Sequence, residues 1–369
     1  MKILFCYESI GIHPIPFYLS KSLKKLGHQV INCGPGKNQD ITTSQTEDIE
    51  NILKKSGPVN LIFLEESSFI PKNLENCSIP KAIHFVDSHL HFDIWHKELA
   101  KTFDFVFFAQ KKYVQKMKGE KSKNVFYLPW ACDPHIHKNL NLKRDYNIGF
   151  VGTFNNLHNP KRTIVFAILK KMFKAKIAQT TYGKDLAKIY SSTKIGINIS
   201  TGSDLNPRTF EIMASGALLI TDPQDNMNSF FENKKHLVIY NHLFEVPLLI
   251  KQYLKNEQER SKIAKRGQKE VRTKHTYDLR AKRLMADIII PNKHKVSGSD
   301  DLYALAKTYF FLYHRQTTIS YFKKFLYKKK GLSLKKVRAL IFLSIATISP
   351  PFFYRLSIFF LRRYLRIIH

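Results

Sequence analysis

Residues 206–222 read NPRTFEIMASGALLITD and place a helix start, a helix end and a buried strand in one short stretch. Pro207 suits the first turn of a helix, where its missing N–H costs no hydrogen bond. Apolar residues then recur at the spacing of one helix face, until Gly216 follows as a typical residue after a helix end. The apolar run 217–221 fits a buried parallel strand. This pattern predicts a helix–strand unit of an α/β fold.

Glu211 is the only acidic residue of this predicted helix and lies in its first turns. A carboxylate near a helix N-terminus suits the binding of paired sugar or ribose hydroxyls, while the backbone N–H groups there face an anion. The polar loop before the helix, residues 203–206, is placed to surround such a ligand. The alternative is an ordinary surface glutamate.

The stretch resembles the nucleotide-sugar site of retaining GT-B glycosyltransferases, and most closely their CgeB-like (spore maturation protein) branch. That group has the pattern Arg-x-Phe-Glu-x-Met-Ala-x-Gly-x-x-x-Ile-x-Asp in its C-terminal Rossmann-like domain. The resemblance implies that Glu211 binds the donor ribose and that Arg208 and Asn206 lie near the donor. The acidic residue that the wider group often has before this helix is replaced by Ser203, with Asp204 next to it.

The first part of the chain repeats apolar runs of strand length with helical segments between them. Such repetition predicts a parallel sheet covered on both faces. A helix is expected over residues 15–26, and neither a Gly-x-Gly-x-x-Gly after the first run nor a Walker A sequence is present. FDFVFFAQ (103–110) and LPWACDP (128–134) resemble the end of the N-terminal domain in CgeB-like proteins. The expected strands are 1–7, 30–33, 60–64, 82–86, 103–109 and 124–131.

A second domain begins with YNIGFVGT at residues 146–153, which predicts a strand that ends in a glycine turn. Glycine allows a diphosphate to approach the backbone, and a nearby cation neutralises it. Related enzymes keep basic residues after this loop, so we expect Gly152, Thr153 and Arg162 to bind the donor, with Lys161 as the second choice of cation. A solvated basic pair on a helix is the alternative.

Candidate catalytic residues follow the fourth apolar run. If the reaction inverts the anomeric centre, a protein base is needed, and Asp87 or His89 would supply it. If it retains the anomeric configuration, the diphosphate itself helps to deprotonate the acceptor. We assign Gly11, His13 and His91 to the acceptor side. The histidines lack the spacing of a metal site, and the resemblance implies a metal-independent reaction with no cofactor beside the nucleotide-sugar substrate.

Length and composition agree with two domains and an extension. The 369 residues include 28 phenylalanines and are 44% hydrophobic, enough for sizeable cores. We expect an acceptor domain over 1–140, a nucleotide-sugar domain over 141–290 whose last helix crosses back, and a basic helical extension over 297–369. The four cysteines show no paired metal spacing and no leader pattern opens the sequence, so we expect reduced thiols in a cytoplasmic protein.

The net charge of +31 indicates an anionic partner. No nucleic-acid-binding motif accompanies it, which disfavours nucleic acid. Residues 297–369 hold eight lysines and six arginines against two aspartates. Their apolar runs are interrupted by proline and arginine and are too short to span a bilayer. This composition favours helices lying on the inner face of an anionic membrane, and we expect the chain to tolerate truncation at Ser297. A soluble appendage packed on the other domains, or a protein-binding surface, remains an alternative.

The sequence therefore predicts an α/β protein of GT-B architecture, with two facing Rossmann-like domains, parallel sheets and a basic helical C-terminal extension. The expected function is transfer of a sugar from a nucleotide-sugar donor to a glycan, lipid or protein acceptor of the cell envelope. The reaction is expected to be retaining and metal-independent. The alternative is a catalytically inactive GT-B adaptor at the membrane surface.

Overall fold

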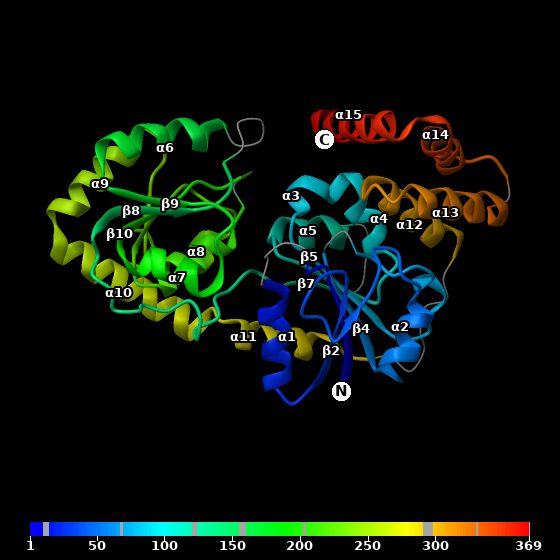
Figure 1. Ribbon diagram of the computed structural model, residues 1–369, viewed down its shortest axis with the longest axis horizontal. Coiled ribbons are helices and arrows are strands. Elements are labelled where there is room, and N and C mark those ends of the chain that lie inside the picture. Colours follow the sequence, from blue (N-terminus) through cyan, green and yellow to red (C-terminus); the bar gives the residue numbers. More distant parts are fainter. Residues whose placement is uncertain are drawn as a thin grey trace. The chain divides into compact units, whose positions relative to one another are not determined.

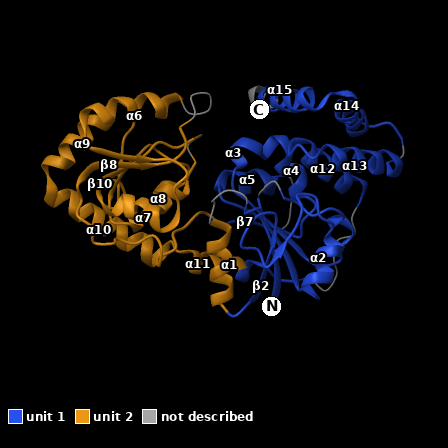
Figure 2. Cartoon of the chain, in the orientation of Figure 1, with its two compact units in different colours: residues 1–11, 27–128, 285–369 blue, residues 12–26, 129–284 orange. Residues whose placement is uncertain are grey.

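The computed structural model describes two compact units (Figure 2). Unit 1 contains residues 1–11, 27–128 and 285–369, and unit 2 contains residues 12–26 and 129–284. The predicted acceptor-side residues Gly11 and His13 lie outside the described residues. The structure describes the chain except for residues 10–14, 67–68, 120–123, 155–159, 202–203, 291–297, 330 and 369.

Unit 1 is built on a seven-stranded parallel sheet with the strand order β3-β2-β1-β4-β5-β6-β7 (Figure 1). Leu4 of β1 lies opposite Ile31 of β2 on one side and Ile62 of β4 on the other. Every residue of β4 and β5 is buried, because both faces of a parallel sheet are covered. The strands are β1 (Lys2–Cys6), β2 (Gln29–Gly34), β3 (Ile41–Thr42), β4 (Leu61–Glu65), β5 (Lys81–Phe85), β6 (Phe105–Phe108) and β7 (Val125–Tyr127).

Two helices of the predicted extension belong to the core of unit 1. In α12 every residue from Asp301 to Phe311 is buried, and Tyr309 donates a hydrogen bond to the Ile70 and Pro71 carbonyl oxygens, each at 3.0 Å. The backbone N–H of Asn73 donates to the Tyr321 hydroxyl of α13 at 2.6 Å. Truncation at Ser297 would expose this core, so the expectation that the chain tolerates it is revised. The helices of unit 1 are α2 (Ile49–Ser56), the 3-10 turn η1 (Leu74–Asn76), α3 (Ser88–His91), the π-helical turn η2 (Phe92–His96), α4 (Lys97–Ala100), α5 (Lys111–Gly119), α12 (Ser299–Phe311) and α13 (Arg315–Lys328).

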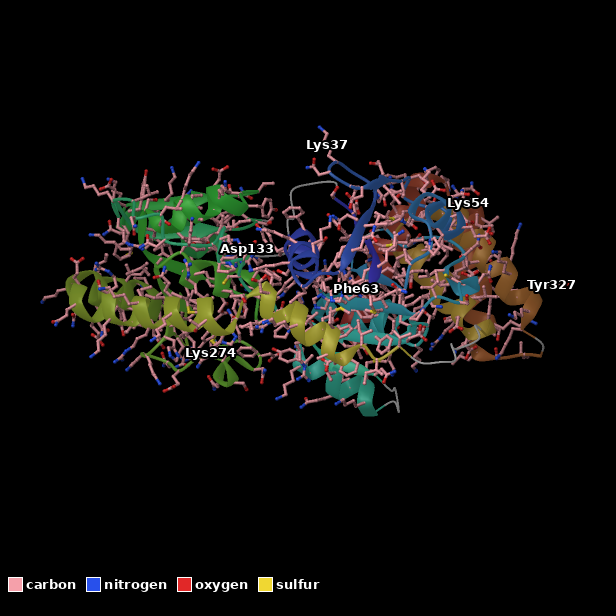
Figure 3. The ribbon with its side chains drawn as sticks, turned by 90° about the horizontal axis from the view of Figure 1, so that it is seen from below. Lys37, Lys54, Phe63, Asp133, Lys274 and Tyr327 are labelled. Carbon is pink, nitrogen blue, oxygen red and sulfur yellow. The ribbon has the colours of Figure 1, made fainter. Side chains whose placement is uncertain are left out.

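The last two helices, α14 (Leu334–Ile348) and α15 (Pro351–Ile368), form an outer layer of unit 1 (Figure 1). Tyr327, at the end of α13 before this layer, is 95% exposed and points away from the fold (Figure 3). No described helix is long and apolar enough to cross a bilayer. Large apolar side chains nevertheless remain exposed on this layer: Leu334, Val337, Leu340, Ile341, Ile348, Phe352, Phe353, Phe359, Phe360 and Tyr364.

Unit 2 contains a five-stranded parallel sheet in the order β12-β11-β10-β8-β9. The opening pattern of the sequence is confirmed here, since Pro207 begins α8, Gly216 follows its end with a φ of +80°, and a strand comes next. The elements are α1 (Ile15–Lys25), β8 (Tyr146–Val151), α6 (Pro160–Met172), β9 (Ala175–Ala178), α7 (Gly183–Ser191), β10 (Thr193–Asn198), α8 (Pro207–Ala214), β11 (Leu218–Thr221), η3 (Met227–Ser229), β12 (Val238–Ile239), α9 (Glu245–Lys255) and α10 (Glu257–Lys274), and α11 (Tyr277–Asp287) extends from it.

The predicted architecture is confirmed: two Rossmann-like units with parallel sheets are followed by a helical C-terminal region. Helix α1 belongs to unit 2, and the C-terminal helices belong to unit 1. The domain limits near residues 140 and 290 stay predictions.

Candidate functional site

The glycine turn after β8 is closed against an arginine of α8. Arg208 donates from Nε to the Val151 carbonyl oxygen at 2.7 Å and from Nη1 to Oδ1 of Asn198 at 2.6 Å. A Cβ atom at Gly152 would lie 2.5 Å from Nη2 of Arg208 and 2.8 Å from the Phe150 ring. The absence of a side chain at Gly152 is therefore what allows Arg208 to lie under the turn.

A second arginine lies beside the first. Arg162 is 7% exposed and donates from Nε to the Ile199 carbonyl oxygen at 2.9 Å and from Nη2 to the Thr201 hydroxyl at 3.1 Å. The guanidinium carbons of Arg208 and Arg162 lie 4.7 and 5.9 Å from the centre of the Phe150 ring. Burial, and then the charge of Arg208, lower the pKa of Arg162 to about 10. Arg162 is buried and Arg208 partly buried, and their positive charges repel each other, so the arrangement favours a bound anion.

Glu211 supplies the carboxylate of the site. Its side chain is only 13% exposed, and burial raises its pKa to about 7, while Arg208 acts in the opposite direction. The alternative of an ordinary surface glutamate is therefore wrong. Near pH 7 the protonated and ionised forms are both populated, so a ligand that favours the ionised form shifts this balance.

These residues line one pocket of about 200 Å³ in unit 2. It lies at the carboxyl ends of parallel strands, where α/β folds bind their ligands. Six of the seven predicted donor-binding residues line it, and Lys161 is exposed on α6 outside it. Asn206 donates to Oδ1 of Asn198 at 3.3 Å, so it shares the acceptor of Arg208. The lining residues are Ile15, Val151, Gly152, Thr153, Arg162, Thr180, Thr181, Tyr182, Leu186, Asn206, Pro207, Arg208 and Glu211.

Sequence reasoning missed the turn that follows β9. Thr180 has a φ of +50°, which is rare for a β-branched residue, and Gly183 has a φ of +58°. Both flank Tyr182, and the turn lines the pocket. Backbone strain of this kind is concentrated at ligand-binding sites. Residues 179–183 read QTTYG directly after a strand, and this glycine-containing polar turn was the available signal.

The predicted catalytic residues form a separate group in unit 1, at the carboxyl end of β5. Oε2 of Glu66 accepts hydrogen bonds from the backbone N–H groups of Val86 and Asp87 at 2.6 and 2.8 Å. Nε2 of His96 lies 2.9 Å from the other Glu66 oxygen. Asp87 is exposed at the protein surface. Desolvation by the surrounding protein, and then the negative charge of Glu66, nevertheless raise the pKa of its carboxyl group. Glu66 thus holds the turn that carries Asp87.

His89 and His91 follow Asp87 on α3, and both are partly buried. The His91 ring lies 5.7 Å from the Trp95 ring and 5.5 Å from the His96 ring, measured between centres. Among the described residues, no three metal-ligand side chains converge. The predicted site residues therefore fall into two groups, donor residues in unit 2 and candidate catalytic residues in unit 1.

A larger cavity of about 760 Å³ lies in unit 1 beside α4, α12, α14 and α15. Its charges pair within the wall: Lys307 lies 3.2 Å from Glu98, and Lys335 lies 2.8 Å from Asp300. A wall with such internal ion pairs presents no uniform field to a charged ligand.

Comparison with known proteins identifies the domain that contains most of the residues lining the unit 2 pocket. Residues 138–286 match a protein-family model described as glycosyl transferase-like. No curated protein sequence matches the chain. Similar solved structures include a sucrose-phosphate synthase from Thermosynechococcus elongatus, at 10% identity and a TM-score of 0.59, covering 77% of this chain and 97% of that one.

Two further structures share the fold. Anabaena HepE, solved in complex with UDP-glucose, has 9% identity and a TM-score of 0.58, with 78% of this chain and 100% of that chain covered. A glycosyltransferase from Rickettsia africae has 13% identity and a TM-score of 0.55, with 77% and 97% covered. At these identities the likeness concerns the fold. The chain therefore carries a glycosyl transferase-like domain at residues 138–286, within a fold of GT-B architecture.

Proposed function

We propose that the protein transfers a sugar from a nucleoside diphosphate-sugar held in the unit 2 pocket to an acceptor hydroxyl. The observation that carries this proposal is the convergence of Arg162, Arg208 and Glu211 in one pocket beside Gly152. Arginine forks match phosphate oxygens, and a carboxylate matches a pair of ribose hydroxyls. A nucleoside diphosphate carries both groups, with the diphosphate attached to the ribose.

In the proposed reaction the bond from the anomeric carbon to the diphosphate oxygen breaks, and a bond from that carbon to the acceptor oxygen forms. The leaving diphosphate gains negative charge, which Arg162 and Arg208 stabilise from fixed positions. In a retaining reaction the acceptor proton passes to the departing diphosphate, as the CgeB-like resemblance implies. In an inverting reaction Asp87 or His89 takes that proton. The proposal favours retention and uses no metal in either step.

For the acceptor, we propose a glycan, lipid or protein of the cell envelope, with the enzyme bound to the inner face of an anionic membrane. The support is the outer layer of unit 1, where Phe352 is 70% and Phe360 58% exposed. Arg338, Arg355 and Arg363 are exposed on the same two helices. Apolar side chains next to arginines suit the interface of an anionic bilayer. The sequence expectation placed the membrane surface on the whole of residues 297–369. Because α12 and α13 belong to the core, we now propose that only α14 and α15 contact the membrane.

The rival function is an adaptor that kept the fold and lost catalysis. The lack of an acidic residue at Ser203 motivates it, and that position lies outside the described residues. Isothermal titration with UDP-glucose, and with GDP-, ADP- and CMP-sugars, tests the proposal. We expect at least one donor to bind below millimolar concentration and to be slowly hydrolysed, with water as the acceptor. Binding without turnover of donor, with every acceptor class supplied, would support the adaptor. Failure of all four donors to bind would contradict the donor site itself.

A further inference from the structure

Close to Glu211, and not among the residues lining the pocket, lies a histidine that the proposed chemistry does not use. His137 is 1% exposed, and its Nε2 lies 3.7 Å from Oε1 of Glu211. Within the described part of the chain, this Nε2 has no hydrogen-bond partner. A buried polar nitrogen without a partner is costly, so its position next to a carboxylate requires an explanation.

The tautomer of His137 follows from its other ring nitrogen. The backbone N–H of Asp133 donates to Nδ1 of His137 at 3.0 Å, and the His137 N–H donates back to the Asp133 carbonyl oxygen at 2.7 Å. Nδ1 is therefore an acceptor, and in the neutral ring the proton must be on Nε2. Burial lowers the pKa of His137 to about 4, so the ring is neutral at physiological pH.

The turn that carries His137 is itself firmly held. Oδ1 of Asp133, which is labelled in Figure 3, accepts from the backbone N–H of His135 at 2.8 Å. Oδ2 of the same carboxylate lies 3.3 Å from Nζ of Lys21 on α1. The imidazole also packs edge-on against the Tyr18 ring, with the centres 5.3 Å apart. These contacts leave the ring little freedom, so its Nε2 stays close to the Glu211 carboxylate.

We propose that His137 is a positioning residue for ribose recognition: its neutral Nε2–H fixes one oxygen of Glu211 and leaves the carboxylate free to accept both ribose hydroxyls. The inference rests on the proposed donor site. A shift of less than 1 Å brings the 3.7 Å separation into hydrogen-bond range, and ionisation of Glu211 on ligand binding favours that shift. A neutral donor stabilises the carboxylate without cancelling its charge, as an imidazolium would.

Tyr18 is a second buried donor group close to Glu211. Its hydroxyl is buried and, among the described residues, has no hydrogen-bond partner. Burial and then the charge of Glu211 raise the pKa of Tyr18, so the hydroxyl keeps its proton and remains a donor. A Cβ atom at Gly183 would lie 3.7 Å from that oxygen, which places the hydroxyl beside the pocket turn.

Two substitutions at position 137 separate the roles of the ring nitrogens. In His137→Asn the amide oxygen replaces Nδ1 as the acceptor for Asp133, and the Nε2–H is lost. In His137→Gln the longer side chain returns an N–H near the original Nε2 position. The probes are UDP, GDP, ADP and CDP, and the tightest of the four is compared with its 2′,3′-dideoxy form in wild type, His137→Asn, His137→Gln and Glu211→Ala.

We expect the preference for the ribose form to fall about tenfold in His137→Asn and to recover in part in His137→Gln, since a hydrogen bond to a charged group is lost and regained. Thermal unfolding confirms that each variant is folded. An unchanged preference in folded His137→Asn, beside a lost preference in Glu211→Ala, overturns the role of His137 alone. If wild type binds none of the four nucleotides, the proposed function fails, and this inference fails with it.

Discussion

Arg208 and Gly152 fit together so closely that the second residue has no room for a side chain. Nη2 of Arg208 lies 2.5 Å from the point where a Cβ atom of residue 152 would be. The guanidinium is held there by the Val151 and Asn198 oxygens, so it cannot retreat without losing both hydrogen bonds. Gly152 therefore makes room for the protein's own cation.

Gly152→Ala should therefore displace Arg208 and weaken diphosphate binding. We expect a loss of about 1–3 kcal/mol of folding stability, the usual cost of overpacking, together with a clear loss of nucleoside diphosphate affinity. The control is Gly119→Ala at the end of α5, where nothing lies within 4 Å of the added carbon. Chemical denaturation and isothermal titration report the two effects. Equal behaviour of the two variants would show that the close contact is unimportant.

Glu211→Gln should stabilise the empty protein at alkaline pH. The folded-state pKa of about 7 is above the ordinary 4.5, so the folded chain holds a proton that the unfolded chain releases between these values. Stability from this group is fully present below pH 4.5 and is lost as the pH rises towards 7, by up to about 3 kcal/mol. The variant lacks this loss. Between pH 5 and pH 8 the free energy of unfolding should therefore fall in wild type but not in Glu211→Gln. The same change in both proteins would contradict the raised pKa of Glu211.

Nucleoside binding should strengthen as the pH rises through about 7, because the ionised Glu211 is the better acceptor for ribose hydroxyls. The probe is a nucleoside, since a phosphate group titrates in the same range. In Glu211→Gln the affinity should be lower and independent of pH. A wild-type affinity that is flat between pH 5.5 and 8.5 would remove the carboxylate from ribose recognition.

Arg208→Ala and Arg162→Ala should each weaken nucleoside diphosphate binding by about 10- to 100-fold and nucleoside binding far less, since charge-assisted bonds to phosphate are lost. Lysine at either position should restore only part of the lost diphosphate affinity, because its ammonium group lacks the planar, forked geometry of a guanidinium group. Arg260→Lys is the control: Arg260 is 4% exposed in the same unit and donates to the Tyr253 carbonyl oxygen at 2.9 Å. If diphosphate and nucleoside affinities fall by the same factor, the arginines serve only the fold.

Replacing Phe352, Phe353 and Phe360 by serine should weaken binding to phosphatidylglycerol vesicles, by roughly tenfold or more for each side chain that enters the bilayer. The matched control is Phe244→Ser, just before α9 of unit 2, with Leu248→Ser on α9, where the side chains are 73% and 63% exposed. Co-sedimentation in low and high salt, with phosphatidylcholine vesicles as the neutral comparison, measures the effect. Identical sedimentation of both variants and wild type would contradict the membrane surface on α14 and α15.

Local sequence pattern was sufficient to predict six of the seven strands of unit 1 and the helix–strand unit formed by α8 and β11. The helix from Pro207, the strand after Gly216 and the turn at Gly152 depend on periodicity, on the fixed φ of proline and on the freedom of glycine, all of which act over a few residues. Resemblance then linked Glu211 to a ribose, an assignment that periodicity alone does not contain and that remains a prediction.

Tertiary structure decided which of these residues meet. The sequence alone does not show which residue of the basic pair Lys161–Arg162 is buried. In the structure Arg162 is buried and bonded to Ile199 while Lys161 is exposed, because only one side of α6 faces the sheet. His137 and Glu211 are distant in the chain and meet through the order of the strands and the turn at Asp133. Likewise residues 297–369 look like a basic appendage by composition, and the aromatic side chains of α12 and α13 within them are nevertheless core. Burial depends on which surfaces the whole fold brings together, and the local periodicity of the sequence does not determine this.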